Sequence, residues 1–314
     1  MSIKSITIID FIAFGLFRLL RGLFGFLPRR LCLGLGTVSG VLLFYLDKKH
    51  RRLALANLEK AFGRELSPAD LRSLARDSFR QFSRVIADNL KWLHLGESRS
   101  EELLQVEGEE NLRRALQEGK GVLLFSAHLG NWEVASLAVS RIGRLNVVAR
   151  PLDNRLLEKD LVRFRNSLGA RAISKFQAAR PVLQSLRQNE IVAILIDQNV
   201  LRSQAVFVDF FGLPAATTPS LASFYLHAGS PVLPVFCYPT PSLSYLVRIG
   251  PPLQIDLTGD PKQDVLKITQ SSTKMIEAEI RAHPSHWFWL HNRWRTRPEG
   301  EEAARSSTSG EKNA

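Results

Sequence analysis

The sequence predicts an α/β fold, in which helices flank a mainly parallel central sheet and an N-terminal helical segment anchors the chain to a membrane. From residue 119 onward, short β-branched apolar runs alternate with helical patterns, as in proteins with parallel sheets. The first 50 residues combine long apolar stretches with clustered basic residues. Across the chain, 45% apolar and 23% charged residues make a globular composition, which excludes a mainly disordered chain.

The first predicted element is an apolar helix at residues 6–27, long enough to span a bilayer. On a helical projection Asp10, Arg18 and Arg21 fall on one narrow stripe, while Ile, Leu and Phe cover the rest. This pattern is typical of a helix that lies in the membrane interface, and a spanning helix stays open if the stripe faces protein. A signal peptide is disfavoured, because arginines interrupt the stretch and no small-residue cleavage site follows it.

The next apolar stretch, residues 31–46, has no charge and is too short for a standard span, so we expect a buried or re-entrant helix. The basic run DKKHRR follows at 47–52. Lys and Arg after an apolar segment mark the cytoplasmic side and attract anionic lipid, although a solvated helix cap is the alternative. We therefore expect residues 1–50 to form a membrane anchor.

The remaining elements define one domain at 51–298 and a disordered tail at 299–314, which has no large apolar residue to bury. Ser67 followed by Pro68 predicts the start of a long helix. Periodicity predicts strands at 121–127, 145–150, 191–196, 231–238 and 243–250, and helices at 51–62, 67–93, 132–141, 155–168, 177–188, 218–227 and 260–282.

Charge and cysteine content limit the partners and cofactors. The formal net charge is +12, and nine Lys or Arg against two Asp place +7 of it in residues 1–52. Such a field fits an anionic membrane surface, a nucleic acid or an acidic protein. Cys32 and Cys237 are too few for a disulfide scaffold or a cysteine-rich zinc site, and favour a reducing compartment. We expect neither a metal nor a redox cofactor.

The most informative motif is GVLLFSAHLGNWE at residues 121–133. Its buried strand delivers His128 to the carboxyl end, where open α/β sheets place reacting groups. In one helix His128 and Glu133 would point about 140° apart, so we expect His128 in the turn and Glu133 in the first helical turn. Glu133 would then bind one imidazole nitrogen and leave the other as a general base. The alternative is a half-buried histidine near a glutamate that only stabilises the helix dipole.

Several blocks resemble the lipid A late acyltransferase family of Gram-negative bacteria, within the lysophospholipid acyltransferase superfamily. The resemblance covers about residues 5–298. Besides the His128 motif it rests on RRLALANLEKAF at 51–62, RPLDN at 150–154, LIDQN at 195–199 followed by VFVDFFGLPAATT, and HPSHWFWLHNRWRTRP at 283–298. One departure is Gly63-Arg64, where the family usually has proline.

The resemblance implies a fatty acyl chain delivered by acyl carrier protein and accepted by a hydroxyl of a lipid A precursor, at the cytoplasmic face of the bacterial inner membrane. It makes His128 the base and Glu133 its orienting partner. A base held by a carboxylate can deprotonate a substrate hydroxyl, so no enzyme serine is needed.

The expected substrate-binding residues are Arg150, Asn154, Asp197 and Gln198. Arg150 would end a strand and bind an acceptor phosphate or a developing oxyanion. Asp197 and Gln198 also end a strand, so they would bind polar groups of the acceptor or brace Arg150, and a capping turn is the alternative.

The aromatic and basic cluster near the end of the domain has two interpretations. Its members are Trp287, Phe288, Trp289 and Trp294, interleaved with His291, Arg293, Arg295 and Arg297. Such residues suit lipid headgroups or single-stranded nucleic acid, and about half of them would be core. No recognised nucleic-acid module accompanies the cluster, so we expect no nucleic-acid partner.

Three rival functions stay open on the sequence. The same chemistry could use another acceptor, such as a lysophospholipid, a glycosyl phospholipid or an amino-acid lipid. Water could replace the lipid hydroxyl in a hydrolase, although no Gly-x-Ser-x-Gly elbow is present. A non-catalytic membrane or nucleic-acid binding protein could keep the same fold.

Overall fold

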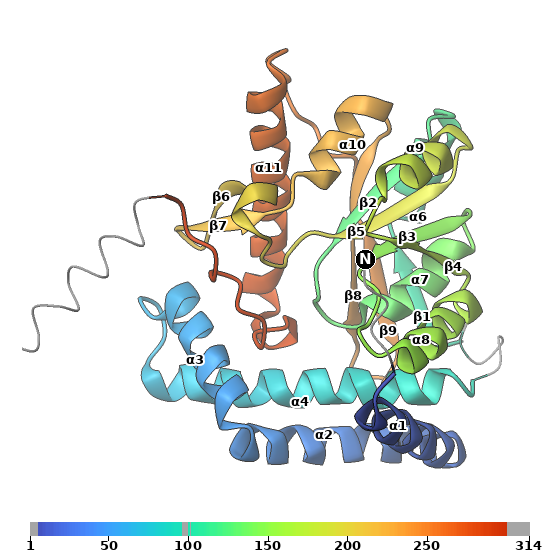
Figure 1. The fold of residues 1–314 in the computed structure, drawn as a ribbon, viewed down its shortest axis with the longest axis vertical. Helices are drawn as coiled ribbons and strands as arrows, with labels where there is room; N and C mark the ends of the chain where they lie inside the picture. The colour runs from blue at the N-terminus through green and yellow to red at the C-terminus, as the bar shows by residue number, and fades with distance from the viewer. Residues whose placement is uncertain (1–5, 96–99, 101, 300–314) are drawn as a thin grey trace, which may run out of the picture.

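The computed structural model of the chain describes residues 6–95, 100 and 102–299. Four helices form its N-terminal part: α1 (Ile8–Phe26), α2 (Arg29–Leu46), α3 (Lys48–Phe62) and α4 (Pro68–Trp92). Figure 1 shows α1, α2 and α4 as a layer beneath the sheet-containing body. Apart from Glu299, the expected tail at 299–314 lies outside the described residues.

Helix α2 packs lengthwise on α4 because small residues let the two backbones approach. A Cβ at Gly36 would lie 2.8 Å from Ala87 Cβ, and one at Gly40 would lie 2.6 Å from the Cα of Arg80. The opposite face of α2 is exposed, including Val38 at 57%. Residues 31–46 therefore form a helix that is buried on one side only. By length and composition alone, α2 is also apolar enough to cross a membrane.

Helix α1 contacts the body through its polar stripe. The side chain of Thr7 accepts the backbone N–H of Asp10 and caps the helix. Arg21 pairs with Asp160 at 3.3 Å, and the side chain of Asn154 donates to the Asp10 carbonyl at 3.0 Å. Every residue of α1 stays at least partly exposed, so its apolar side is left facing outward.

The seven-stranded sheet confirms the predicted α/β class. Its order is β1-β9-β8-β2-β5-β3-β4, and all neighbours are parallel except β8 and β9. The strands are β1 (Leu104–Glu107), β2 (Val122–Ser126), β3 (Leu145–Ala149), β4 (Ala170–Ser174), β5 (Ile191–Leu195), β8 (Val232–Pro239) and β9 (Tyr245–Ile249). A separate antiparallel hairpin joins β6 (Val206–Phe210) to β7 (Leu213–Thr217).

Helices cover both faces of this sheet, so β2 is buried throughout. Leu123 and Phe125 of β2 join one apolar cluster, and Val122 and Leu124 join the other. The helices of the body are α6 (Glu109–Gln117), α7 (Trp132–Ser140), α8 (Arg155–Ser167), α9 (Ala179–Arg187), α10 (Ser220–Ala228) and α11 (Pro261–Ala282), with short 3₁₀ turns η1 (Arg202–Gln204) and η2 (Pro284–His286). Burial on both faces explains why β2 reads as an uninterrupted apolar run.

Candidate active site

His128 lies in the turn between β2 and α7, as the motif predicted. Strand β2 ends at Ser126, and α7 begins at Trp132 with Asn131 as its N-cap. The Asn131 side chain accepts the backbone N–H of Val134 at 3.3 Å. The imidazole is therefore placed at the carboxyl edge of the sheet, where ligands bind in open α/β folds.

The backbone of this turn is held from two sides. Gly130 has a φ of +62°, and a Cβ there would lie 1.8 Å from the Cys237 carbonyl oxygen. Its N–H donates to the His286 carbonyl at 3.0 Å, and the N–H of Phe288 donates to the His128 carbonyl at 2.9 Å. Only glycine fits this position, and the turn is clamped between β8 and the segment that follows η2.

The His128 imidazole is oriented by Asp197. Its Nδ1 lies 2.9 Å from Asp197 Oδ1, and the His128 backbone N–H donates to Oδ2 at 2.9 Å. Trp287 Nε1 also donates to Oδ2, at 2.8 Å. The carboxylate is buried, whereas the His128 side chain keeps 21% exposure. Strands β2 and β5 pair at their last residues, Ser126 and Leu195. His128 and Asp197 each lie two residues beyond these strand ends, so the pairing brings them together.

Electrostatics favour an ionised Asp197. Burial alone would raise its pKa, but the charge and hydrogen bonds of His128 and the Trp287 hydrogen bond lower it to about 2. An ionised carboxylate can only accept, so Nδ1 carries the proton and Nε2 presents its lone pair. Gln198 Nε2 lies 3.4 Å from His128 Nε2, which fits a weak donor to that lone pair. This is the protonation pattern of a general base.

The expected contact between Glu133 and His128 is not found. Glu133 instead forms a bidentate pair with Arg165 of α8, at 2.6 Å and 3.0 Å, and both side chains are nearly buried. From the first turn of α7, Glu133 lies beside the sheet-facing pocket described below rather than over the turn. A guanidinium fork satisfies both carboxylate oxygens, which one imidazole nitrogen cannot do. Asp197 occupies the role that we expected for Glu133.

The other predicted binding residues fall in different places. Arg150 follows β3 as expected, but it is exposed and pairs with Asp153 at 2.8 Å. Asp197 bonds to His128 and Trp287 and does not brace Arg150. Asn154 caps α8 by accepting the N–H groups of Leu156 and Leu157, and donates to α1. The structure thus gives Asn154 a role in the fold, and its contact with substrate stays a prediction.

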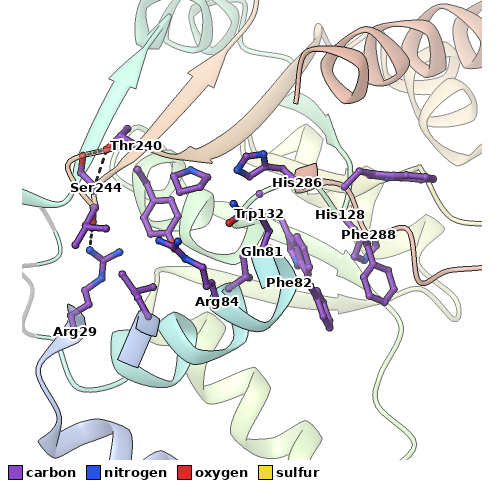
Figure 2. Close-up of a pocket in the computed structure, with 17 residues that line it drawn as sticks. Arg29, Gln81, Phe82, Arg84, His128, Trp132, Thr240, Ser244, His286 and Phe288 are labelled. Carbon is purple, nitrogen blue, oxygen red and sulfur yellow. Dashed lines mark hydrogen bonds between the residues drawn. The ribbon is translucent and has the colours of Figure 1, made fainter. Parts of the chain in front are cut away.

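A pocket opens beside His128 and contains about 530 Å³ of empty space, including the part open to solvent. Figure 2 shows Gln81, Phe82 and Arg84 projecting into it from α4, with His286 across from them. Its other walls come from α2 and from the loop between β8 and β9. The lining is Arg29, Leu33, Gln81, Phe82, Arg84, Val85, His128, Gly130, Trp132, Pro239, Thr240, Leu243, Ser244, Tyr245, His286, Trp287 and Phe288.

A second pocket of about 570 Å³ lies between the sheet and α7. Its walls are mostly Leu, Val and Ala from β2, β3, β5 and α7, and the Glu133–Arg165 pair is its charged element. Trp132 lines both pockets, and its ring centroid lies 4.9 Å from that of His128. Trp132 therefore stands between the two pockets, next to the imidazole.

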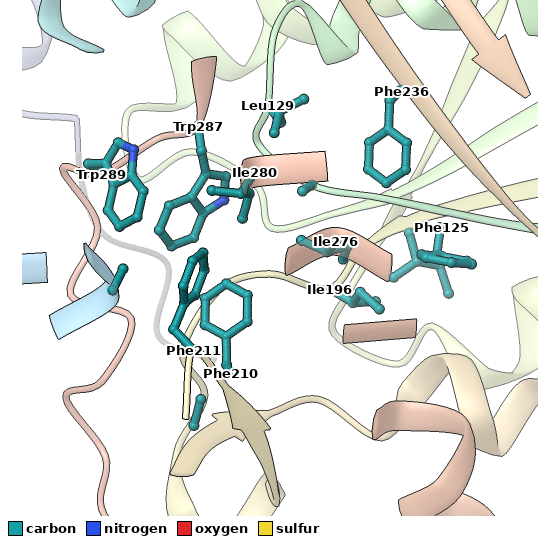
Figure 3. Close-up of a cluster of buried hydrophobic side chains, with 14 of the residues drawn as sticks. Phe125, Leu129, Ile196, Phe210, Phe211, Phe236, Ile276, Ile280, Trp287 and Trp289 are labelled. Atoms are coloured by element: carbon teal, nitrogen blue, oxygen red, sulfur yellow. The ribbon is translucent and has the colours of Figure 1, made fainter. Parts of the chain in front are cut away.

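The late aromatic cluster is mostly core rather than a lipid or nucleic-acid surface. Trp287, Trp289 and Trp294 are each at most 2% exposed, and Figure 3 shows Trp287 and Trp289 packed near Phe210 and Phe211. Arg293 is also buried, donates to the Ala216 carbonyl, and has its pKa lowered to about 10 by burial. Within the cluster, Phe288 lines the pocket and Trp287 supports Asp197.

A buried polar network connects α2 and α4 to the His128 turn. Arg29 of α2 forms two hydrogen bonds to Asp88 of α4, at 2.7 Å and 2.6 Å. Tyr245 donates to Asp88 at 2.5 Å and accepts from the Asn131 side chain at 3.1 Å. Sequence reasoning missed Asp88 and Tyr245, because they lie in separate elements that carry no motif.

The fold and site define an α/β protein with a carboxylate-held histidine beside a pocket at the edge of its sheet, an arrangement that suits general-base chemistry. In the described part of the chain, no group of three or more His, Cys, Asp or Glu side chains could hold a metal ion. The chain belongs to the bacterial lipid A biosynthesis acyltransferase family, whose sequence profile matches residues 3–296. It is thus a member of a family of lipid acyltransferases.

Curated relatives agree with this membership. The chain is 28% identical over 258 residues to a phosphatidylinositol mannoside acyltransferase of Mycolicibacterium smegmatis, covering 80% of this chain and 82% of that protein. It is 26% identical over 277 residues to the lipid A biosynthesis palmitoleoyltransferase of Escherichia coli, covering 88% of each. A phosphatidylinositol mannoside acyltransferase of Mycobacterium tuberculosis is 30% identical over 192 residues, which span 60% of this chain and 58% of that protein.

Proposed function

We propose that this protein transfers a fatty acyl chain from acyl carrier protein to a hydroxyl of a lipid A precursor or a related glycolipid, with His128 as the general base. The observation that carries the proposal is the hydrogen bond between His128 Nδ1 and the buried Asp197 carboxylate, which leaves Nε2 facing the pocket. Nε2 takes the proton of the acceptor hydroxyl as its oxygen attacks the thioester carbonyl. The new C–O bond forms, the C–S bond breaks, and the proton passes from Nε2 to the departing sulfur.

Asp197 stabilises the imidazolium that forms during the proton transfer. Two further donors, the His128 backbone N–H and Trp287 Nε1, hold the carboxylate in place, so it needs no rearrangement as charge develops. Gln198 donates to Nε2 in the resting site and gives way to the acceptor hydroxyl. Arg150, exposed at the end of β3, is available to the acceptor headgroup.

We assign the acyl chain to the pocket between the sheet and α7. Its apolar walls suit a fatty chain, and Trp132, which lines this pocket, also contacts the His128 ring. Glu133 acts here by neutralising Arg165, because an unpaired guanidinium would be costly next to an alkyl chain. The ion pair and the pocket's depth together set which chain lengths fit.

Residues 1–50 are proposed to anchor the protein in the interface at the cytoplasmic side of the inner membrane. The outward face of α1 carries apolar side chains such as Ile8, Ile9 and Ile12, which are 66% to 79% exposed. Leu31 and Val38 extend this surface on α2. Apolar side chains beside a basic segment favour an anionic lipid surface, and the net charge of +12 also favours encounter with an acidic carrier protein.

Transfer of radiolabelled acyl chains to a panel of acceptors tests the substrate assignment. The donors are acyl carrier protein and coenzyme A thioesters, and the acceptors are a lipid A precursor, a phosphatidylinositol mannoside and a lysophospholipid. We expect product on the lipid A precursor from acyl carrier protein. Product on another lipid alone, or free fatty acid alone, would contradict the proposed acceptor.

Sedimentation with anionic liposomes tests the anchor. The Ile9→Asp, Ile12→Asp double variant changes only exposed side chains, so folding should be retained, and we expect most of the protein to stay in the supernatant. Deletion of residues 1–27 should have the same effect. Wild-type sedimentation in both variants would remove the anchor from the proposal.

A further inference from the structure

The pocket beside His128 has an unusual charge balance. Its polar lining includes Arg29, Arg84, His128 and His286, but no Asp or Glu side chain among the described residues lines it. The loop between β8 and β9 adds hydroxyl groups at Thr240 and Ser244. A concave site lined by cations and hydroxyls, without a carboxylate, favours an anionic ligand group.

The two arginines of this pocket differ in their partners. Arg29 is fully engaged by the buried Asp88 carboxylate, so its charge is compensated within the protein. Arg84 is half-buried, and within the described ranges 6–95, 100 and 102–299 its guanidinium makes no hydrogen bond or ion pair. A half-buried guanidinium has lost part of its hydration, and without an anion no ion pair replaces that loss.

The other described groups of the pocket do not neutralise Arg84. The pKa of His286 is lowered to about 4 by burial and by the charges of His283 and Arg84, so its ring is neutral at pH 7. Figure 2 places Arg84 on the α4 side of the pocket and His286 opposite, with Thr240 and Ser244 on the loop above. The pocket thus holds one uncompensated positive charge, with neutral hydrogen-bonding groups around it.

The position of Arg84 indicates where the anion comes from. Helices α2 and α4, which carry Arg29 and Arg84, also expose apolar residues such as Leu35 and Ile86. A lipid whose chains lie along these helices would present its headgroup to the pocket. His128 lines the same pocket, so one acceptor could reach both residues.

Resting on the proposed acyltransferase function, we propose that Arg84 forms an anionic subsite that binds a phosphate group of the lipid acceptor and directs the acceptor hydroxyl toward His128. The planar guanidinium presents paired donors that match two phosphate oxygens. Thr240 and Ser244 place neutral hydroxyl groups on the loop above it, where they bond to each other at 2.7 Å. The phosphate anchors the headgroup, and Nε2 of His128 meets the hydroxyl.

A kinetic comparison of four proteins on two acceptors tests this subsite. The proteins are wild type, Arg84→Gln, Arg84→Lys and Arg80→Gln, and the acceptors are a lipid A precursor and the same lipid after phosphatase treatment. Arg80 is the matched control, because it lies one turn earlier on α4 and pairs with Asp77 at the surface. Loss of a charge-assisted phosphate contact should raise the KM of Arg84→Gln for the phosphorylated acceptor about tenfold or more.

We expect Arg84→Lys to recover part of this loss, and Arg80→Gln to match wild type. The KM for the acyl donor and the kinetics with the dephosphorylated acceptor should not change in Arg84→Gln. An equal loss on both acceptors would reduce Arg84 to a structural role, and a raised KM for the donor alone would assign the phosphate to the donor. Either result overturns the proposal.

Equilibrium binding of the radiolabelled precursor in detergent micelles, without donor, separates this subsite from the proposed function. Weaker binding by Arg84→Gln supports the subsite even if no transfer occurs in wild type. Unchanged binding together with normal transfer refutes the subsite and leaves the acyltransferase function intact. Circular dichroism of each variant checks the fold. If Arg84→Gln does not fold, the same comparison is made with Arg84→Lys.

Discussion

Replacement of Asp197 by asparagine should invert the protonation pattern of His128. Both the His128 backbone N–H and Trp287 Nε1 donate to Oδ2, so the amide oxygen of the introduced side chain would occupy the Oδ2 position. The amide NH₂ group then takes the Oδ1 position, 2.9 Å from His128 Nδ1, and donates to it. Because Nδ1 must now accept, the ring proton moves to Nε2, which can no longer act as a base.

The expected loss in kcat for Asp197→Asn is about 10³- to 10⁴-fold, as found when the carboxylate that orients a catalytic histidine becomes an amide. This corresponds to about 4 to 5.5 kcal/mol of transition-state stabilisation. The KM for the acceptor should change little, since Asp197 lies behind the imidazole and the amide is isosteric.

Single-turnover transfer at saturating acceptor measures this loss, with circular dichroism as the check on folding. Asp77→Asn is the matched control, because it removes an exposed carboxylate of α4 that pairs with Arg80. Its rate should equal that of wild type. If folded Asp197→Asn retains more than a tenth of the wild-type kcat, Asp197 does not set the protonation of His128.

Three further predictions concern the surroundings of the base. Glu133→Gln leaves Arg165 without its charge partner, so urea unfolding should show a loss of about 2 kcal/mol, and the KM for the acyl donor should rise while the pH profile of kcat stays unchanged. Gly130→Ala places a Cβ against the Cys237 carbonyl at positive φ, so kcat should fall at least about tenfold in a protein that still folds by circular dichroism. The lowered pKa of Asp197, about 2, contributes roughly 2 kcal/mol of stability above pH 4, and this contribution should be lost as the pH falls toward 2. In Asp197→Asn, the free energy of unfolding should therefore fall less steeply as the pH is lowered from 4 to 2. A shifted pH profile of kcat in Glu133→Gln would count against the described site. Wild-type kcat in Gly130→Ala would count against it as well.

The strands that form the centre of the sheet could be predicted from the sequence, because burial on both faces produces unbroken apolar runs such as β2. The edge strands β1 and β4 were missed. Their alternating or exposed residues, with Arg171 in β4 and Glu107 in β1, give no such run. The hairpin of β6 and β7 was missed as well, since it lies outside the main sheet.

The sequence placed both His128 and Asp197 at strand ends but did not pair them. Their contact depends on β2 and β5 being neighbours in register, and strand order is not encoded in either segment alone. His128 and Glu133 are only five positions apart in the sequence, so we predicted that they contact each other. That spacing does not reveal that Glu133 faces α8, where it pairs with Arg165.

The aromatic cluster shows a similar limit. Tryptophan and arginine in one segment fit a lipid surface, and only tertiary packing shows that Trp289 and Arg293 are buried. Arg84 is half-buried, as are Arg76 and Arg80 of the same helix, so sequence periodicity could not single it out as the arginine that lines a pocket without carboxylates among the described residues.

The most direct test of the central claim is single-turnover acyl transfer by His128→Gln beside wild type, with acyl carrier protein as donor and a lipid A precursor as acceptor. Glutamine keeps a polar side chain at the edge of the sheet but cannot take the hydroxyl proton. We predict a rate at least about a hundredfold below wild type, with unchanged circular dichroism and unchanged binding of the acceptor. Transfer at the wild-type rate by the folded variant would contradict the assignment of His128 as the base.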